Sequence, residues 1–223
     1  MKYMKQPILI TGCPRSGASM IAGIIKLCKA RMGRLNGMNE NIDARLQQDM
    51  LMRRLRVDVK GQYPLPVVSR LKPVLGFANN IHNAVTGGLS GEWAFKDSRI
   101  LLTWSIWNKA FPKAKWIIVR RRKDDILKSC KQTAYMKAFK YPKTLQALNL
   151  QTEEEGWHWM ISQYEKRIEE VKMKANMMAV VYPEKMVEDD YSEIRSIVED
   201  WLKLEWNDEV VNYMNEKLKK VKK

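Results

Sequence analysis

Residues 7–19 read Pro-Ile-Leu-Ile-Thr-Gly-Cys-Pro-Arg-Ser-Gly-Ala-Ser, and this stretch decides the fold. Its first five residues form a short apolar run, which favours a strand buried on both faces of a parallel sheet. From Gly17 to about Met32 the apolar residues recur at three- and four-residue spacing, which predicts a helix. The sequence therefore opens with a strand, a glycine-containing loop and a helix.

The loop between these elements suits a phosphate or sulfate group. Unpaired backbone N–H groups and the positive end of the helix dipole converge where a strand passes through a loop into a helix. Gly17 lets the backbone approach a ligand closely, and Arg15 adds a permanent, forked positive charge. Ser16 and Ser19 add hydroxyl donors. A plain turn between strand and helix is the alternative interpretation.

The spacing of Gly12 and Gly17 matches the two glycines of the nucleoside-triphosphate P-loop, G-x-x-x-x-G-K-[ST]. The lysine of that motif does not match, because Ala18 stands in its place. An ATPase, a GTPase or a P-loop kinase acting on a nucleotide or small molecule is therefore a weaker interpretation than another anion-binding protein.

Strand and helix patterns alternate along the rest of the chain, which predicts an α/β fold: a three-layer α/β/α sandwich around a central parallel sheet. Further strands are predicted at 93–96, 115–120 and 177–182. Further helices are predicted at 42–56, 100–110, 124–139, 153–175, 191–204 and 207–221, the last with Asn207 as its N-cap. We expect one domain over residues 1–223, with 33–92 mostly in loops as a variable segment.

The glycine loop resembles the G-x-P-R-S-G-T-S loop of sulfotransferases of the bacterial and viral type, with Ala18 in place of the usual Thr. The resemblance implies a P-loop NTPase-like sulfotransferase fold. It also implies that the loop grips the 5′-phosphosulfate of 3′-phosphoadenosine 5′-phosphosulfate (PAPS). The residues implied in this contact are Gly12, Pro14, Arg15, Ser16, Gly17, Ala18 and Ser19.

A second block resembles the same family. Residues 96–99, Lys-Asp-Ser-Arg, resemble its K-D-P-R element, and Trp107 with residues 111–115 resembles W-x-x-x-F-P-x-A-K. After the next strand the family places an Arg and, eight residues later, a Ser on the 3′-phosphate, and Arg121 and Ser129 have this spacing. Because Arg120 and Arg122 flank Arg121, the register of that arginine stays open by one residue. An Arg at the end of a strand can clamp a phosphate in a bidentate fashion.

The candidate catalytic residues follow from the chemistry of sulfuryl transfer. Cations are needed where charge builds on the leaving phosphate, and the candidates are Arg15 and, by resemblance, Lys96. No metal is expected, since Arg and Lys carry that charge. A general base must accept the acceptor's proton. Glu40 is the first candidate because residues 38–41 resemble the G-F/Y-F-E-N element of related enzymes, and His82 is the alternative.

Composition limits the other possibilities. The chain has 223 residues with 40 Lys+Arg against 25 Asp+Glu, a formal net charge of +15, and no apolar run long enough to span a membrane. The N-terminus is not typical of a secretory signal peptide. Three widely spaced cysteines give neither a disulfide framework nor metal-ligand spacing, which favours a reducing, cytoplasmic location.

The function that the sequence predicts is transfer of a sulfuryl group from PAPS to a hydroxyl or amine, with 3′-phosphoadenosine 5′-phosphate (PAP) as product. The acceptor is expected to be a small molecule or a glycan, and an acidic acceptor would suit the positive charge. Residues 33–92 are expected to be the acceptor-side segment and to form much of its pocket. A basic nucleic-acid-binding protein without catalysis is a further alternative, although no specific nucleic acid is indicated. The five lysines among residues 217–223 are either a solubilising end or an attraction for an anionic acceptor.

Overall fold

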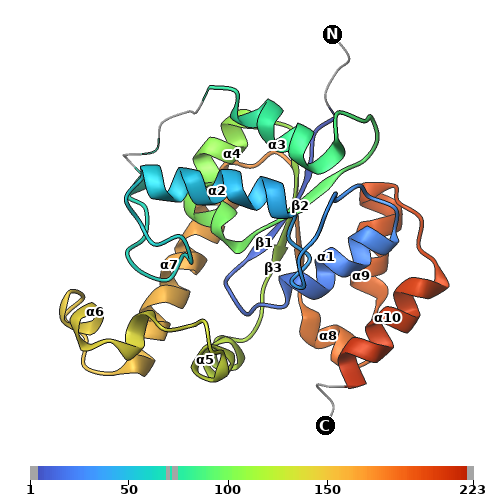
Figure 1. The fold of residues 1–223 in the computed structure, drawn as a ribbon. Coiled ribbons are helices and arrows are strands. Elements are labelled where there is room, and N and C mark those ends of the chain that lie inside the picture. Colours follow the sequence, from blue (N-terminus) through green and yellow to red (C-terminus); the bar gives the residue numbers. More distant parts are fainter. Residues whose placement is uncertain (1–4, 69–70, 72–74, 220–223) are drawn as a thin grey trace.

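The computed structural model describes residues 5–68, 71 and 75–219. One sheet of four parallel strands, in the spatial order β2-β1-β3-β4, lies at its centre (Figure 1). The strands are β1 (Ile8–Gly12), β2 (Ala94–Lys96), β3 (Lys115–Val119) and β4 (Met178–Val181). All four agree with the strands that the apolar runs predict. Because β1 and β3 are neighbours, the loops that follow them start side by side at the carboxyl edge of the sheet.

The side chains of the strands alternate between two hydrophobic cores, one on each face of the sheet. On β3, Trp116 and Ile118 belong to the first core, and Ile117 and Val119 belong to the second. This alternation follows from the two-residue period of a strand. It explains why β3 is apolar at consecutive positions, since neither of its faces meets water.

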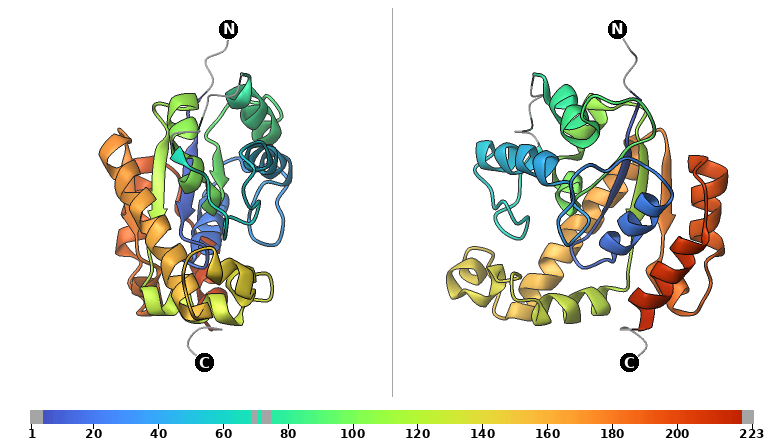
Figure 2. Two further views of the ribbon diagram at one scale, coloured as in Figure 1. Left: turned by 90° about the vertical axis from the view of Figure 1, so that its left-hand side faces the viewer. Right: turned by 45° about the vertical axis from the view of Figure 1, so that its right-hand side comes forward.

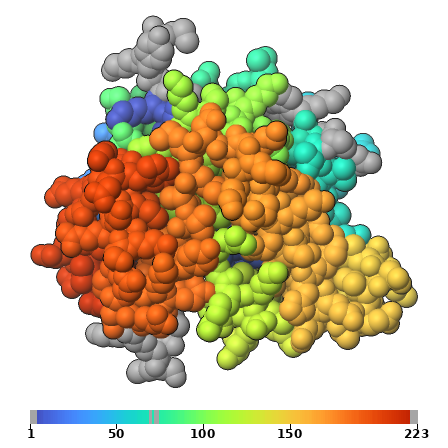
Figure 3. All heavy atoms as spheres, turned by 180° about the vertical axis from the view of Figure 1, so that it is seen from behind, coloured from blue at the N-terminus to red at the C-terminus, as the bar shows by residue number. Residues whose placement is uncertain are grey.

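Helices cover both faces, so the predicted three-layer sandwich is confirmed (Figure 2). The first core is covered by α2 (Ile42–Arg54), α3 (Phe77–Thr86), α4 (Trp104–Ala110), α5 (Lys123–Gln132) and α7 (Glu153–Lys174). The second core is covered by α1 (Ala18–Leu27), α8 (Pro183–Val187), α9 (Ser192–Ser196) and α10 (Asp208–Lys219). The short helix α6 (Pro142–Gln146) buries none of its residues. Seen from behind, the orange and red residues of the C-terminal third cover much of the surface (Figure 3).

Several helices differ in extent from the prediction. Helix α1 ends at Leu27 instead of near Met32, because the chain turns at Lys29, where φ is 70°. It then runs beside β2: the N–H of Arg31 donates to the Glu92 carbonyl, and the N–H of Ala94 donates to the Arg31 carbonyl. Backbone pairing at the edge of the sheet has therefore replaced the last turn of the predicted helix.

Three other predicted helices are broken into shorter pieces. The segment 100–110 starts as a 3-10 helix, Ser98–Thr103, before α4. The segment 124–139 ends with α5 at Gln132 and is followed by a short 3-10 helix, Ala138–Lys140. The segment 191–204 is α9 followed by a π-helical turn, Ile197–Leu202. The helix predicted over 207–221 begins as expected, since Asn207 Oδ1 accepts the N–H of Val210 at 3.3 Å, and residues 220 and 221 lie outside the described residues.

Helix α3 lies in the segment that the sequence predicts to be mostly loop. Glycines with positive φ flank it on both sides, Gly76 at 75° and Gly87 at 62°. These glycines make the region look like a series of turns. The helical signal is the spacing of Phe77, Ile81 and Val85, which are four residues apart and all buried against the first core.

Helix α7 begins with a complete capping box. Thr152 Oγ1 accepts the N–H of Glu155, and the Glu155 carboxylate accepts the N–H of Thr152, so two free donors of the first turn are satisfied. Within this helix, Gly156 is packed so closely that an added Cβ would lie 2.3 Å from Phe139 Cγ. Phe139 in turn packs edge-on against Trp157 at 4.7 Å between ring centroids.

We expect Gly156→Ala to destabilise the protein. Alanine favours a helix interior by about 1 kcal/mol over glycine, but displacing the Phe139 ring costs about 1–3 kcal/mol. Urea unfolding should therefore show a lower free energy of unfolding for the variant. The matched control is Gly37→Ala, where an added Cβ would meet no atom within 4 Å. A variant at Gly156 that is more stable than wild type would contradict this packing argument.

Candidate active site

The loops at the carboxyl ends of all four strands surround one large cavity of about 1950 Å³. Its wall includes residues 13–19 after β1, 96–99 at the end of β2, 120–123 after β3 and 182–185 after β4. Ligands of open parallel sheets bind at this edge, because the strands all point toward it and the helix N-termini gather there. Most of the candidate residues predicted from the sequence therefore line this one cavity, although they lie in distant segments of the chain.

The loop between β1 and α1 is held in a specific backbone shape. Gly17 is the N-cap of α1 with φ 97°, and Arg15 also has a positive φ of 72°. A Cβ at Gly12 would lie 2.3 Å from the Val119 carbonyl oxygen, so this glycine is required by the approach of β1 to β3. Gly12 does not line the cavity, whereas residues 13–19 do.

The loop also carries an unsatisfied donor. Ser16 is 1% exposed, and no described residue forms a hydrogen bond with its Oγ. Buried hydroxyl groups almost always have a partner. An anion at the N-terminus of α1 would provide such a partner, so the loop fits a phosphate or sulfate group. Ala18 is the first residue of α1 and brings no side-chain donor.

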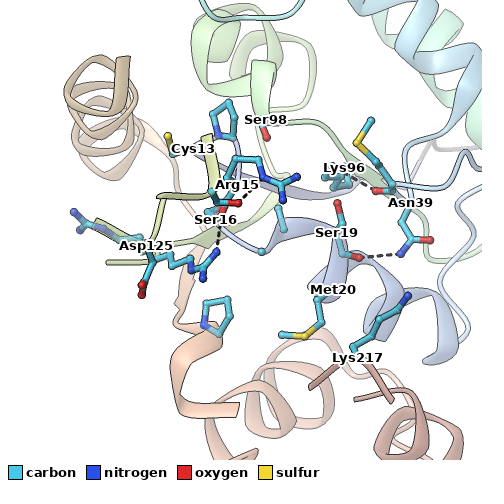
Figure 4. Close-up of a pocket in the computed structure, with 18 of the residues that line it drawn as sticks. Cys13, Arg15, Ser16, Ser19, Met20, Asn39, Lys96, Ser98, Asp125 and Lys217 are labelled. Atoms are coloured by element: carbon cyan, nitrogen blue, oxygen red, sulfur yellow. Dashed lines mark hydrogen bonds between the residues drawn. The ribbon is translucent and has the colours of Figure 1, made fainter. Parts of the chain in front are cut away.

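Arg15 joins the two predicted anion-binding elements. Its Nε donates to Ser129 Oγ of α5 at 2.9 Å, and its carbonyl oxygen accepts a hydrogen bond from the Arg121 guanidinium at 3.2 Å. A third contact runs from the Arg15 guanidinium to the Tyr135 hydroxyl at 3.4 Å. Arg15 therefore joins residues that are more than one hundred positions from it in sequence. Figure 4 shows Arg15 at the cavity beside Ser16.

The three consecutive arginines after β3 have different surroundings. Arg120 pairs with Glu165 and with Glu169, and Arg122 is bound to Asp125 at 2.8 Å. Arg121 is half-buried, and no carboxylate of the described residues pairs with it. Arg121 is therefore the arginine of this run whose charge is available to a ligand.

A buried ion pair lies at the other side of the loop. Glu40 and Lys96 are 8% and 4% exposed, and Lys96 Nζ donates to Glu40 Oε1 at 2.9 Å. The second oxygen, Glu40 Oε2, accepts from Asn36 at 3.1 Å and lies 3.5 Å from Arg45 Nε. Lys96 also donates to the Met38 carbonyl at 3.4 Å, so one of its three ammonium hydrogens stays free for a ligand.

The neighbouring carboxylate, Asp97, is part of a structural network. Burial alone would raise the pKa of Asp97, but the Arg99 guanidinium beside it holds that pKa below its usual value. Arg99 is also bound to Asp49 and donates to the Val59 carbonyl at 2.5 Å. The network anchors the loop 57–63, which Tyr164 also holds by donating to the Gly61 carbonyl at 2.9 Å.

Two further residues of the site were not found from the sequence. Gln62 is 1% exposed, donates to the Tyr135 carbonyl at 3.0 Å and accepts from the N–H groups of Lys137 and Ala138. It therefore fixes the segment that brings the Tyr135 hydroxyl to Arg15. Neither residue belongs to a motif, and their contact spans 73 positions, so no local pattern reveals it.

The remaining titratable candidates lie in less suitable places. His82 is in α3, packs edge-on against Trp93 at 5.5 Å between ring centroids, and does not line the cavity. Cys13 lines the cavity, but burial raises the pKa of its thiol well above the ordinary value. Burial likewise raises the pKa of Cys130 to about 12. These two thiols are therefore protonated at neutral pH and are poor nucleophiles.

Among the described residues of the variable segment 33–92, only some line the cavity. Its lining residues come from the loop before α2, from the start of that helix and from the loop 57–63: Gly37, Met38, Asn39, Glu40, Arg45, Val59 and Lys60. Helix α3 of the same segment packs on the first core instead.

These features define an α/β protein of P-loop-like architecture with an anion-binding cavity at the carboxyl edge of its sheet. The chain belongs to the sulfotransferase family, whose model matches residues 7–208. This membership agrees with the two motif blocks and supports sulfuryl transfer as the general activity.

Solved structures of two mycobacterial sulfotransferases share the fold. Sulfotransferase STF9 from Mycobacterium avium aligns with 97% of this chain and 68% of its own, at 15% identity and a TM-score of 0.57. Sulfotransferase STF1 from Mycobacterium tuberculosis H37Rv (type1 form) aligns with 96% of this chain and 71% of its own, at 14% identity and a TM-score of 0.58. A search of curated proteins found no significant match.

The described part of the chain has neither a helix suited to span a membrane nor a cluster of metal ligands. None of its helices has the length and apolar character that crossing a membrane requires. Residues 5–68, 71 and 75–219 also contain no group of three or more His, Cys, Asp or Glu side chains placed to hold a metal ion.

We expect the Asp97 charge to stabilise the fold. Asp97→Asn should lower the free energy of unfolding at pH 7 by about 3 kcal/mol, because it leaves buried Arg99 with one fewer anionic partner. The folded-state pKa of Asp97 lies below 3.8, so this stabilisation is complete above pH 3.8 and is lost as the pH falls toward the folded-state pKa.

Urea unfolding of wild type and variant at pH 7 and near pH 3 tests this dependence. The difference between the two proteins should shrink at the lower pH. Asp208→Asn, at an exposed aspartate that forms no ion pair among the described residues, is the control and should change little at either pH. A difference that is constant with pH would show that the Asp97 charge is not its source.

Proposed function

We propose that the protein transfers a sulfuryl group from PAPS to a hydroxyl or amine acceptor and releases PAP. The observation that carries the proposal is the meeting of two anion-binding elements at Arg15, which contacts Ser129 at 2.9 Å and Arg121 at 3.2 Å. A nucleotide phosphorylated on both its 5′ and 3′ positions has two anionic groups at a fixed, short separation. It therefore matches a cavity with one anion site after β1 and a second after β3.

The 5′-phosphosulfate is assigned to the loop 13–19. There the N-terminus of α1 and the Ser16 hydroxyl supply donors, and Arg15 supplies charge. Ser19 and Ala18 contribute backbone N–H groups of the first turn. Gly12 is assigned the structural task of letting β1 approach β3, and Pro14 shapes the turn.

The 3′-phosphate is assigned to Arg121 and Ser129. Arg121 has no carboxylate partner among the described residues, in contrast to the arginines beside it. Ser129 Oγ accepts the Arg15 N–H, so its own hydroxyl hydrogen points elsewhere and is available to a phosphate oxygen. Arg15 is hydrogen-bonded to both Ser129 and Arg121, so the groups assigned to the 5′ and 3′ ends of the nucleotide hold one another in place.

The reaction exchanges one sulfur–oxygen bond for another. The bond from sulfur to the bridging oxygen of the donor breaks, and its electron pair stays on the 5′-phosphate of PAP. A new bond forms between the acceptor oxygen or nitrogen and sulfur, and the acceptor's proton goes to a base. Arg15 and Lys96 are assigned to the charge that grows on the bridging oxygen. Because these cations are fixed in place before reaction, little reorganisation is needed.

Glu40 is assigned as the base. It lines the cavity next to Lys96, whereas His82 lies outside it. Asn36, Arg45 and Lys96 hold the Glu40 carboxylate at a fixed orientation. Each carboxylate oxygen has two lone pairs, so Oε1 of Glu40, which accepts from Lys96, keeps a site for the acceptor's proton while the free N–H of Lys96 is directed to the donor.

Three free cysteines, all buried, suit a reducing compartment. We therefore place the activity in the cytoplasm. The single sheet, shared by the elements from β1 to β4, suits one catalytic domain over residues 1–223.

PAP binding tests the nucleotide assignment. Wild type should bind PAP in the micromolar range, and Arg121→Ala should bind it about 10- to 100-fold more weakly, because a contact to a charged group is worth about 1.5–3 kcal/mol. Isothermal calorimetry measures both. Arg122→Ala is the matched control and should bind PAP nearly as wild type does, since Arg122 is largely exposed and paired with Asp125. Absence of PAP binding by wild type would overturn the proposed function.

Replacement of the base tests the catalytic assignment. Glu40→Gln should lower kcat by about 10²- to 10⁴-fold with PAPS and a reactive acceptor, the range expected for general-base catalysis. Its PAP affinity should stay close to that of wild type. His82→Ala should keep kcat within about twofold, as expected for a side chain outside the cavity. If Glu40→Gln retains full kcat, the base is another group.

A further inference from the structure

The cavity is larger than one nucleotide requires. Pockets that enclose a drug-sized ligand have volumes of about 300–1000 Å³, whereas this cavity measures about 1950 Å³. The residues assigned to the nucleotide phosphates come from β1–α1, α5 and the loop after β3, and Lys96 of β2 is assigned to the bridging oxygen, between the nucleotide and the acceptor. The part of the cavity beyond them is here called the acceptor end, and it is lined by Met38, Asn39, Glu40, Arg45, Lys60, Lys96 and Lys217.

Figure 4 shows the position of this end. Lys217 of α10 lies near Met20, with Ser19, Asn39 and Lys96 on the same side, while Arg15 and Asp125 lie toward the other side of the cavity. Asn39 Nδ2 donates to the Ser19 carbonyl at 2.8 Å, which ties the loop before α2 to the start of α1. The acceptor end is therefore continuous with the anion-binding loop.

Positive charge dominates the acceptor end. Four of its residues are cations and one is an anion, Glu40. Glu40 is already shared between Lys96 at 2.9 Å and Arg45 at 3.5 Å. Lys60 and Lys217 are exposed, and neither forms an ion pair with any described residue.

Four of the five other acidic residues of the cavity are already engaged, and the fifth, Glu188, is exposed. Asp97 is bound to Arg99, Glu165 to Arg120, and Asp125 to Arg122. Glu184 and Glu188 come from α8 and the residue after it, and Glu184 accepts the backbone N–H of Arg122 at 2.7 Å. Arg45 of α2, Lys60 of the loop 57–63 and Lys217 of α10 come from three separate segments that all line this cavity, so its positive charge is not a local sequence run.

We propose that the acceptor is an anion, which carries a carboxylate, sulfate or phosphate group close to the hydroxyl that receives the sulfuryl group. This inference rests on the proposed function, because it assumes that the nucleotide fills the opposite end. Complementary charge favours the encounter and the orientation of an anionic acceptor. An anion attracted by Lys60 and Lys217 and held at Arg45 would present its hydroxyl to Glu40, which lies 3.5 Å from Arg45 Nε.

Matched acceptor pairs test the proposal in the PAP-saturated protein at low ionic strength. One pair is 4-hydroxyphenylacetate and its neutral amide, and the other is a hyaluronan tetrasaccharide and a chitin tetrasaccharide. In at least one pair, the anionic member should bind about tenfold more tightly than its neutral match, as measured by calorimetry. Added salt should reduce this preference, since it screens exposed charges.

Two triple variants separate the local charge from the total charge. R45Q/K60Q/K217Q should lose the preference for the anionic member. K26Q/K113Q/K166Q removes the same number of charges at exposed lysines that do not line the cavity, and it should keep the preference. Both variants should still bind PAP, which shows that they are folded and that the nucleotide end is intact.

The possible failures are distinguishable. If PAP binds but no anionic compound binds more tightly than its neutral match, the acceptor inference is wrong and the proposed function stands. If both triple variants lose the preference equally, the three residues are not its source and the inference is wrong. If a single-stranded DNA oligonucleotide binds more tightly than every small anion and depends on the same three residues, these cations serve a nucleic acid instead. If PAP itself does not bind, the proposed function fails first.

Discussion

The pairing of β1 with β3 is the constraint on which the site depends. Gly12 and Val119 are register partners at the carboxyl edge, and the absence of a side chain at Gly12 lets the two strand ends meet. The loop that bears Arg15 and the run that bears Arg121 therefore start at adjacent points. A hydrogen bond between these two residues follows from the strand pairing, although 106 positions separate them in the chain.

Much of the fold could be predicted from the sequence because its strands are short, apolar on consecutive positions and bounded by glycine, proline or charge. Ile8–Gly12 and Lys115–Val119 show this pattern clearly. Helix α3 was missed because its flanking glycines resemble turns, and the early end of α1 was missed because pairing at Arg31 is a long-range effect. The local spacing of apolar residues does not show whether a segment will continue a helix or pair with a distant strand.

In the candidate site, too, residues in local motifs could be predicted, whereas residues that matter through long-range contacts could not. The motif residues Arg15, Lys96 and Arg121 could be named from spacing and resemblance, and the structure brings them to one cavity. Gln62 and Tyr135 could not, because their importance comes from a hydrogen bond across 73 positions. The sequence also could not show which of the three consecutive arginines lacks a carboxylate partner, because those partners lie on other segments or depend on side-chain placement.

The loop 57–63 has a consequence for how this cavity can change over evolution. Its backbone is fixed on both sides of Lys60, by Arg99 at the Val59 carbonyl and by Tyr164 at the Gly61 carbonyl. The Lys60 side chain itself is exposed and makes no contact that holds the loop. A mutation at this codon can therefore reverse or remove a charge in the lining of the cavity while the framework stays intact, so the charge that the cavity offers to the proposed anionic acceptor can drift without a loss of foldability.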